Sequence, residues 1–107
     1  DKVLVFHHAG LDVRFIQKAS VESFRCPMLF SYIDTMHIEK QRLKLQGKTA
    51  GLRLAHCRER YGLGPVSQHN ALADAQATAE LLLAQLSYSG DVDNLRLYDL
   101  GLSVSSM

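Results

Sequence analysis

The sequence has no long apolar segment and few cysteines, and both absences exclude classes of protein. No apolar run approaches the roughly 20 residues that a membrane-spanning helix needs, so we expect no membrane partner. The first residues have no basic leader and no small-residue cleavage site, so they do not resemble a secretory signal. The two cysteines, Cys26 and Cys57, form neither a CxxC pair nor a disulfide framework. A cytoplasmic protein is the simplest expectation.

The composition is that of an ordinary globular protein, 47% hydrophobic and 21% charged, and 107 residues suffice for one small domain. The net charge is only +1, but its distribution is uneven. Residues 38–60 carry seven basic and two acidic side chains, a local +5, whereas residues 61–107 carry one basic and five acidic, a local −4. A basic segment beside an acidic one fits a protein that binds phosphates near bound cations. The alternative is a solvated helical face.

Strand and helix patterns alternate along the chain, which predicts an α/β fold with parallel strands flanked by helices. Continuous apolar runs at residues 3–6 and 28–33 predict buried strands. Four helices are predicted. They span residues 11–24, residues 34–45 with a cap at Asp34 and Thr35, residues 52–63 with Gly62 at the end, and residues 68–86. The weak pattern of residues 87–107 predicts a tail with a short strand at 95–98 and a frayed Ser-rich end.

Each of the two longest predicted helices has an apolar stripe that we expect to face the core. In the first helix the stripe consists of Leu11, Phe15, Ile16 and Ala19, which places Phe15 in the core rather than on a base-stacking surface. In the last helix it consists of Leu72, Ala75, Ala79, Leu82 and Leu86. Asp74 lies off this stripe, and His69 precedes a first turn that Asn70 alone could cap.

Asp12 and Asp74 are candidate ligands for a cation. Asp12 follows the C-terminal end of the first predicted strand, where ligand sites of α/β sheets gather, and Asp74 lies near the start of the last helix. Two carboxylates that meet there would repel each other unless a cation lay between them, and Mg²⁺ and Mn²⁺ prefer such oxygen ligands. His69 could then accept a proton from a metal-bound water molecule.

Each of these residues also has a purely structural interpretation. Asp12 could cap the helix at residues 11–24, Asp74 could be a first-turn carboxylate stabilised by the helix dipole, and His69 could be an ordinary loop residue. Zinc is disfavoured, because the spacings of the histidines and cysteines match no common structural site.

Four segments, in order along the chain, resemble the motifs of one enzyme family. They are "VLVFHHAGLDVRFI", "IDT", "LAHCRERYGL" and "HNALADAQATAELL". The first is similar to the second motif of the DEDDh 3′–5′ exonucleases, a hydrophobic strand running into His-Asn-Ala-x-Phe-Asp, and the last to their third motif, His-x-Ala-x-x-Asp-Ala. The family includes the proofreading epsilon subunit of bacterial DNA polymerase III. The resemblance covers residues 3–86 in order and spacing.

The resemblance implies an RNase H-like fold, of which residues 1–86 supply the C-terminal half, followed by a tail at 87–107. It implies that Asp12 and Asp74 are ligands of a two-metal site for Mg²⁺ or Mn²⁺, with His69 as general base and His7 and His8 in contact with substrate. The implied substrate is the 3′ end of single-stranded DNA, and also RNA, cleaved to nucleoside 5′-monophosphates. A polymerase subunit or a second copy of the chain is the expected protein partner.

The sequence departs from the family pattern in two ways. His8 stands where the family has Asn, and no Asp-x-Glu, the first motif that supplies two further acidic ligands, occurs in the 107 residues. Asp91 and Asp93 have a similar spacing, but they follow "SYSG" and not a buried strand. Because the chain begins without Met and within two residues of a strand, we expect an upstream segment to carry the first motif. The alternative function is a non-catalytic nucleic-acid- or partner-binding remnant of the fold.

Overall fold

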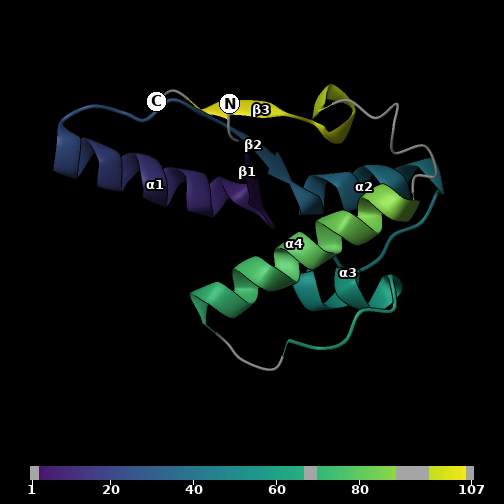
Figure 1. The fold of residues 1–107 in the computed structure, drawn as a ribbon. Helices are drawn as coiled ribbons and strands as arrows, with labels where there is room; N and C mark the ends of the chain where they lie inside the picture. The colour runs from purple at the N-terminus through teal and green to yellow at the C-terminus, as the bar shows by residue number, and fades with distance from the viewer. Residues whose placement is uncertain (1–2, 67–69, 89–96, 106–107) are drawn as a thin grey trace.

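Two successive strand–helix pairs are followed by two further α-helices, a 3₁₀ helix and a last strand, which confirms the predicted α/β class (Figure 1). The computed structural model describes residues 3–66, 70–88 and 97–105. Its elements are β1 (Val3–Phe6), α1 (Ala9–Phe24), β2 (Phe30–Asp34), α2 (Thr35–Leu45), α3 (Leu54–Arg60), α4 (Ala71–Tyr88), the 3₁₀ helix η2 (Leu97–Leu100) and β3 (Ser103–Ser105). Within these described residues, no helix is both long and apolar enough to cross a membrane.

The described strands form one sheet in the order β1-β2-β3. β1 and β2 are parallel, as predicted, with Phe6 opposite Asp34. β3 is antiparallel to β2, with Ser105 opposite Phe30, so the expectation of a frayed Ser-rich end was wrong for Ser103–Ser105. The strand predicted at 95–98 was wrong for its last two residues, which belong to η2, and its first two lie outside the described residues.

β2 begins at Phe30, two residues later than predicted, because the side chain of Gln17 forms hydrogen bonds with both backbone groups of Met28. The Gln17 amide donates to the Met28 carbonyl at 2.6 Å, and its oxygen accepts from the Met28 N–H at 2.8 Å. The same amide donates to the Ser105 hydroxyl at 2.8 Å. One buried glutamine therefore joins α1, the start of β2 and β3.

α1 buries a different face from the predicted one. Its buried residues are Ala9, Gln17 and Ser20, whereas Phe15 is 75% exposed, so its placement in the core was wrong. The physical reason is polar: Ser20 donates to the Cys26 carbonyl at 2.8 Å, and this bond and those of Gln17 turn their face of the helix inward.

The buried face of α4 also differs from the apolar stripe predicted to face the core, since Leu72 is 79% exposed and Ala75 and Ala79 are exposed. The helix packs against α2 and α3 (Figure 1) through Ala77, Thr78, Leu81 and Gln85. Gln85 donates to the Thr35 carbonyl at 3.0 Å, and a guanidinium from α3 donates to the Ala77 carbonyl at 2.9 Å. These polar anchors decide which side of α4 faces the core.

The predicted caps of α2 and α4 and the glycine after α3 are confirmed, although α1 begins two residues earlier than predicted, α3 is shorter and α4 extends to Tyr88. Asp34 caps α2 by accepting from the Met36 N–H at 3.0 Å. Gly62, at φ +73°, follows the last turn of α3, where its N–H donates to the Glu59 carbonyl. Asn70 caps α4, because its side-chain oxygen accepts from the Ala73 N–H at 2.8 Å. Local capping signals in the sequence were thus sufficient to place these ends.

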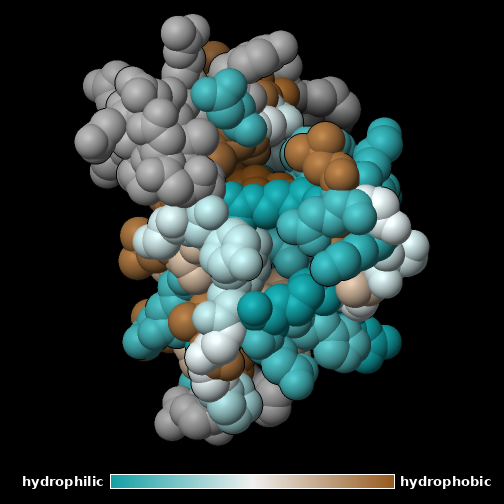
Figure 2. Space-filling view, turned by 90° about the vertical axis from the view of Figure 1, so that its right-hand side faces the viewer, coloured by the Kyte–Doolittle hydropathy of each residue, from teal (hydrophilic) through white to brown (hydrophobic). Residues whose placement is uncertain are grey.

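The basic segment divides into an internal and an external group. Arg42, Arg58 and Arg60 bond to other parts of the protein, whereas Lys40, Lys44, Lys48 and Arg53 are exposed. Hydrophilic side chains cover much of the face in Figure 2. These three arginines therefore stabilise the packing of α2, α3 and α4, which leaves the three lysines and Arg53 for solvent or a ligand.

The internal group surrounds a buried carboxylate, Glu39. It accepts from Arg60 Nε at 2.8 Å and from the Tyr61 hydroxyl at 2.7 Å. Burial by itself raises the pKa of Glu39, but hydrogen bonds from Tyr61, Arg60 and Gln85 outweigh it and hold this pKa below its ordinary value of 4.5. Glu39 therefore stabilises the fold at neutral pH, and its contribution is lost as pH falls through its folded-state pKa.

We expect the free energy of unfolding to fall as pH rises from about 9 to about 12. Burial raises the pKa of Cys57 from 9.0 to about 11, and burial and Glu39 raise that of Tyr61 from 10.0 to about 12. The unfolded chain loses these protons first, so alkaline pH favours unfolding, by on the order of 1–2 kcal/mol per group. Urea unfolding at a series of pH values measures this. Cys57→Ala should flatten the loss between pH 9 and 11, and the exposed Cys26→Ala should not; equal curves for both variants would contradict it.

Candidate active site

Asp12 and Asp74, the two predicted metal ligands, line the same cavity. The cavity has a volume of about 670 Å³. Apart from these two carboxylates, the lining is largely apolar and comes mainly from β1, α1, α3 and α4. The full set of lining residues is Val5, Phe6, His7, Asp12, Phe15, Ile16, Leu54, Ala71, Asp74, Ala75 and Thr78. Residues 62 positions apart in the sequence are thereby brought to one site at the C-terminal end of β1.

Both carboxylates project from the first turn of a helix and are exposed. Neither has a hydrogen-bond or ion-pair partner among the residues whose structure is described. Asp12 is not the cap of α1, because the N-cap residue is His8 and the capping bonds come from elsewhere. The structural interpretation of Asp12 as a cap is therefore wrong, and its oxygens are available for a ligand.

The histidines of the predicted site are placed differently from one another. His7 lines the cavity, but its Nδ1 lies 2.8 Å from the Thr35 hydroxyl and its Nε2 donates to the Leu52 carbonyl at 2.6 Å. His8 is exposed at the start of α1. His69, the predicted general base, lies outside the described residues.

The donor set suits a hard divalent cation but is incomplete. Two carboxylates offer the oxygen ligands that Mg²⁺ and Mn²⁺ prefer. Within 3–66, 70–88 and 97–105, however, no three His, Cys, Asp or Glu side chains are grouped so as to hold a metal ion. Asp12 and Asp74 could therefore bind such an ion strongly only with further acidic ligands.

Two features near this site escaped sequence reasoning. Asp34, predicted only as the cap of α2, also accepts from the N–H groups of His8 and Ala9 at 2.8 and 2.9 Å. The signal that could have shown this is the parallel register that sets Asp34 opposite the end of β1. Phe15 exposes its ring on the cavity. The sequence alone contains no signal for this position, because it depends on which face of α1 is buried.

Arg58 is a further structural residue that the sequence did not distinguish from its basic neighbours. It is 6% exposed and donates to the carbonyls of Gly64 and Ala77 and to the Glu80 carboxylate at 3.0 Å. These bonds join α3, the segment after it and α4. They thereby fix the helix that carries Asp74.

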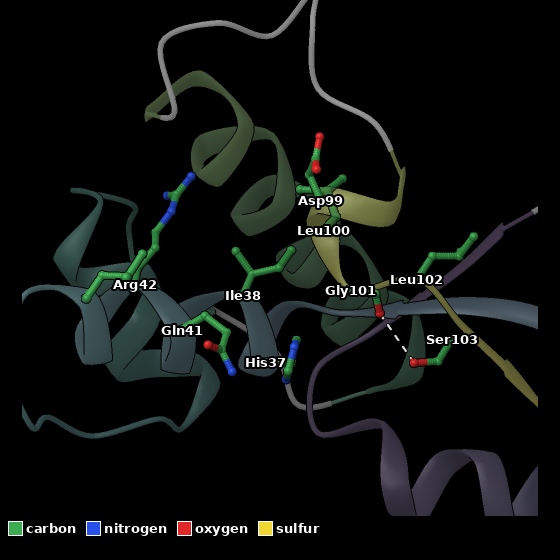
Figure 3. A pocket seen from close by; sticks show the side chains of 10 residues that line it. His37, Ile38, Gln41, Arg42, Asp99, Leu100, Gly101, Leu102 and Ser103 are labelled. Carbon is green, nitrogen blue, oxygen red and sulfur yellow. Dashed lines mark hydrogen bonds between the residues drawn. The ribbon is translucent and has the colours of Figure 1, made fainter.

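A second cavity, of about 540 Å³, lies between α2 and the segment from η2 to β3 (Figure 3). His37, Gln41 and Arg42 approach it from α2, and Asp99 lies on its other side. A hydrogen bond from the Ser103 hydroxyl to the Gly101 carbonyl, at 3.3 Å, shapes its rim. It contains none of the predicted site residues.

Comparison with known proteins supports the motif interpretation. The model of the RNase T exonuclease family matches residues 1–82. A DNA polymerase III PolC-type protein of Thermotoga maritima is 35% identical over 83 residues, and that of Thermotoga petrophila is 32% identical over 83 residues. Each alignment covers 78% of this chain, which spans only about 6% of the length of these relatives. No solved structure matches the chain.

Proposed function

Since the chain belongs to the RNase T exonuclease family, we propose that it carries part of the active site of a metal-dependent 3′–5′ exonuclease. The substrate is the 3′ end of single-stranded DNA, with RNA as a further substrate, and the products are nucleoside 5′-monophosphates. The observation that carries the proposal is the exposure on one cavity of the Asp12 and Asp74 carboxylates, neither of which has a hydrogen-bond or ion-pair partner in the described structure.

In this mechanism Asp12 and Asp74 would hold Mg²⁺ or Mn²⁺ together with the two acidic side chains of an Asp-x-Glu motif, which these 107 residues do not contain. The chemistry supplied by such ions, when bound, would be activation of water and stabilisation of the charge on the phosphate. His69, in the segment before α4, accepts the proton of the attacking water.

Two lining residues, Phe15 and His7, and the neighbouring His8 hold the terminal nucleotide. Phe15 offers an exposed aromatic ring, and stacking on aromatic rings binds bases without sequence preference. His8, at the start of α1, contacts the substrate directly. His7 lines the cavity, but since both its ring nitrogens have protein partners, its contact with the substrate is through its carbon edge.

The relatives suggest a biological setting. They are named PolC-type DNA polymerase III, and an exonuclease segment in a polymerase fits removal of misincorporated nucleotides. We therefore include proofreading for a polymerase in the proposal. A non-catalytic remnant is the second candidate, and the observation that favours it is the absence of a third acidic ligand in the described ranges.

His69→Ala should lower turnover by roughly 10²–10⁴-fold, the usual contribution of a positioned base. A general base must be neutral, so the rate of the unaltered enzyme should fall as pH drops through the titration of this histidine. The measurement is Mg²⁺-dependent release of mononucleotides from a 3′-labelled strand by the chain joined to an Asp-x-Glu segment. A 5′-labelled strand is the control for direction.

Mn²⁺ affinity should change little in His69→Ala, because the imidazole is not expected to bind the metal. Turnover near that of the unaltered enzyme at saturating metal would remove His69 from the mechanism. Binding of single-stranded DNA with no hydrolysis, even with the Asp-x-Glu segment present, would favour the non-catalytic candidate.

A further inference from the structure

The turn between β1 and α1 has a backbone conformation that non-glycine residues rarely adopt. His8 has φ 67° and ψ 62°, which is the left-handed region. His8 is also the N-cap residue of α1, yet its side chain makes no capping hydrogen bond. Something other than His8 must therefore stabilise the first turn of α1.

The carboxylate of Asp34 does so, and it accepts three backbone hydrogen bonds at once. Oδ1 accepts from the N–H groups of His8 at 2.8 Å and Met36 at 3.0 Å, and Oδ2 accepts from Ala9 at 2.9 Å. One carboxylate thus caps α1 and α2 together. Bonds from N–H groups to a charged acceptor are stronger than neutral ones, and helix dipoles favour an anion at this point.

Thr35 and His7 hold the same turn from its other side. The Thr35 hydroxyl, which is fully buried, donates to the Phe6 carbonyl at 3.1 Å and also lies beside His7 Nδ1. His7 Nε2 reaches the Leu52 carbonyl. The left-handed residue is therefore fixed by bonds on both sides, and a strained backbone persists only where its surroundings determine it in this way.

We infer that Asp34 is a positioning residue for Asp12. By holding His8 in the left-handed conformation, it fixes the first turn of α1, which sets Asp12 on the same cavity as Asp74. The inference rests on the proposed function, because Asp12 is taken as a metal ligand. Asp34 does not line this cavity, so it acts through the backbone and touches neither metal nor substrate. Without its charge, the left-handed residue relaxes and Asp12 moves.

The test is Mn²⁺ binding by the 107-residue chain, followed by NMR, because paramagnetic broadening shows which carboxylates lie near the ion. Asp34→Asn places an NH₂ group against backbone N–H donors. The Mn²⁺ concentration for half-maximal broadening at Asp12 should then rise by roughly 10–100-fold, the usual effect of losing a residue that supports a metal ligand. Glu22→Gln, which removes an exposed charge from the far end of α1, is the matched control and should change nothing.

Rescue separates this role from a general loss of structure. Adding His8→Gly to Asp34→Asn should recover most of the Mn²⁺ response, because glycine adopts the left-handed conformation without strain. A loss that came only through the cap of α2 would not be recovered. Mn²⁺ binding is measured in place of turnover because His8 is itself expected to contact the substrate.

A second pair of variants applies if Asp34→Asn does not fold. His8→Val leaves Asp34 in place but disfavours the left-handed conformation, so it should weaken Mn²⁺ broadening at Asp12, whereas His8→Gly should not. An unchanged Mn²⁺ response in a folded Asp34→Asn chain, a response that His8→Gly does not rescue, or equal responses of the two His8 variants would overturn the inference.

Failure of the proposed function would be seen separately. If Mn²⁺ broadens neither Asp12 nor Asp74 in the unaltered chain, the metal role fails, and amide hydrogen exchange at His8 and Ala9 decides the positioning role. Faster exchange in Asp34→Asn, partly reversed at Ala9 by His8→Gly, supports it. Equal exchange in the altered and unaltered chains overturns it.

Discussion

Asp12→Asn or Asp74→Asn is expected to abolish nuclease activity while leaving the fold intact. Replacing a residue that merely supports a metal ligand already lowers metal affinity or activity by about 10–100-fold, so removing a charged ligand should lower activity by more than about 100-fold. Both side chains are exposed and without partners in the described structure, so neither change removes a folding contact. Loss of one of two nearby negative charges relieves repulsion, and the free energy of unfolding without metal should hold or rise.

Isothermal titration with Mn²⁺ and mononucleotide release, measured on the same variants, test this expectation. The experiment needs the chain joined to an Asp-x-Glu segment, because the unmodified chain is expected to be inactive. Glu22→Gln is the control for the loss of one exposed carboxylate on α1. Unchanged Mn²⁺ affinity in both aspartate variants would refute their assignment as ligands. Lost stability without metal would mean that the carboxylates support the fold.

Features of the fold that depend on local signals were predictable from the sequence. The strand at Val3–Phe6, the Asp34 cap of α2 and the glycine after α3 each follow from residues adjacent in the chain. The placement of Asp12 and Asp74 on one cavity was also expected, because Asp12 comes just past the C-terminal end of the first strand, where loops and helix starts such as that of α4 converge. The role of each aspartate remains a prediction.

Features that depend on polar contacts between distant residues were not predictable. The buried face of α4 was wrong because hydropathy ranks Gln85 as a surface residue, whereas its amide bonds the carbonyl of Thr35, fifty residues away. β3 was missed because Ser103–Ser105 has no strand pattern and is ordered by pairing with β2 and by Gln17. The second function of Asp34 likewise required the register between β1 and β2.

The 107-residue chain alone is expected not to degrade nucleic acid. Its candidate site offers two carboxylates, whereas the resemblance implies four for a two-metal centre, and fewer anionic ligands bind the metals weakly. The packing of β1 also indicates that the chain alone is incomplete. In the described structure β1 pairs only with β2, Leu4 exposes apolar surface on β1, and Phe15 exposes its ring on the cavity that Val5 and Phe6 also line. An unpaired apolar strand edge favours pairing with another chain or aggregation.

Adding an upstream segment that bears Asp-x-Glu should therefore restore two properties together. The segment would cover the free edge of β1, which raises solubility, and it would complete the ligand set, which permits Mg²⁺-dependent release of mononucleotides from a 3′-labelled strand. The same segment with both acidic residues changed to amides should restore solubility alone. Robust hydrolysis by the unmodified chain, blocked by EDTA, would contradict the prediction. It would mean that acidic residues outside the described structure, with Asp91 and Asp93 the first candidates, complete the site.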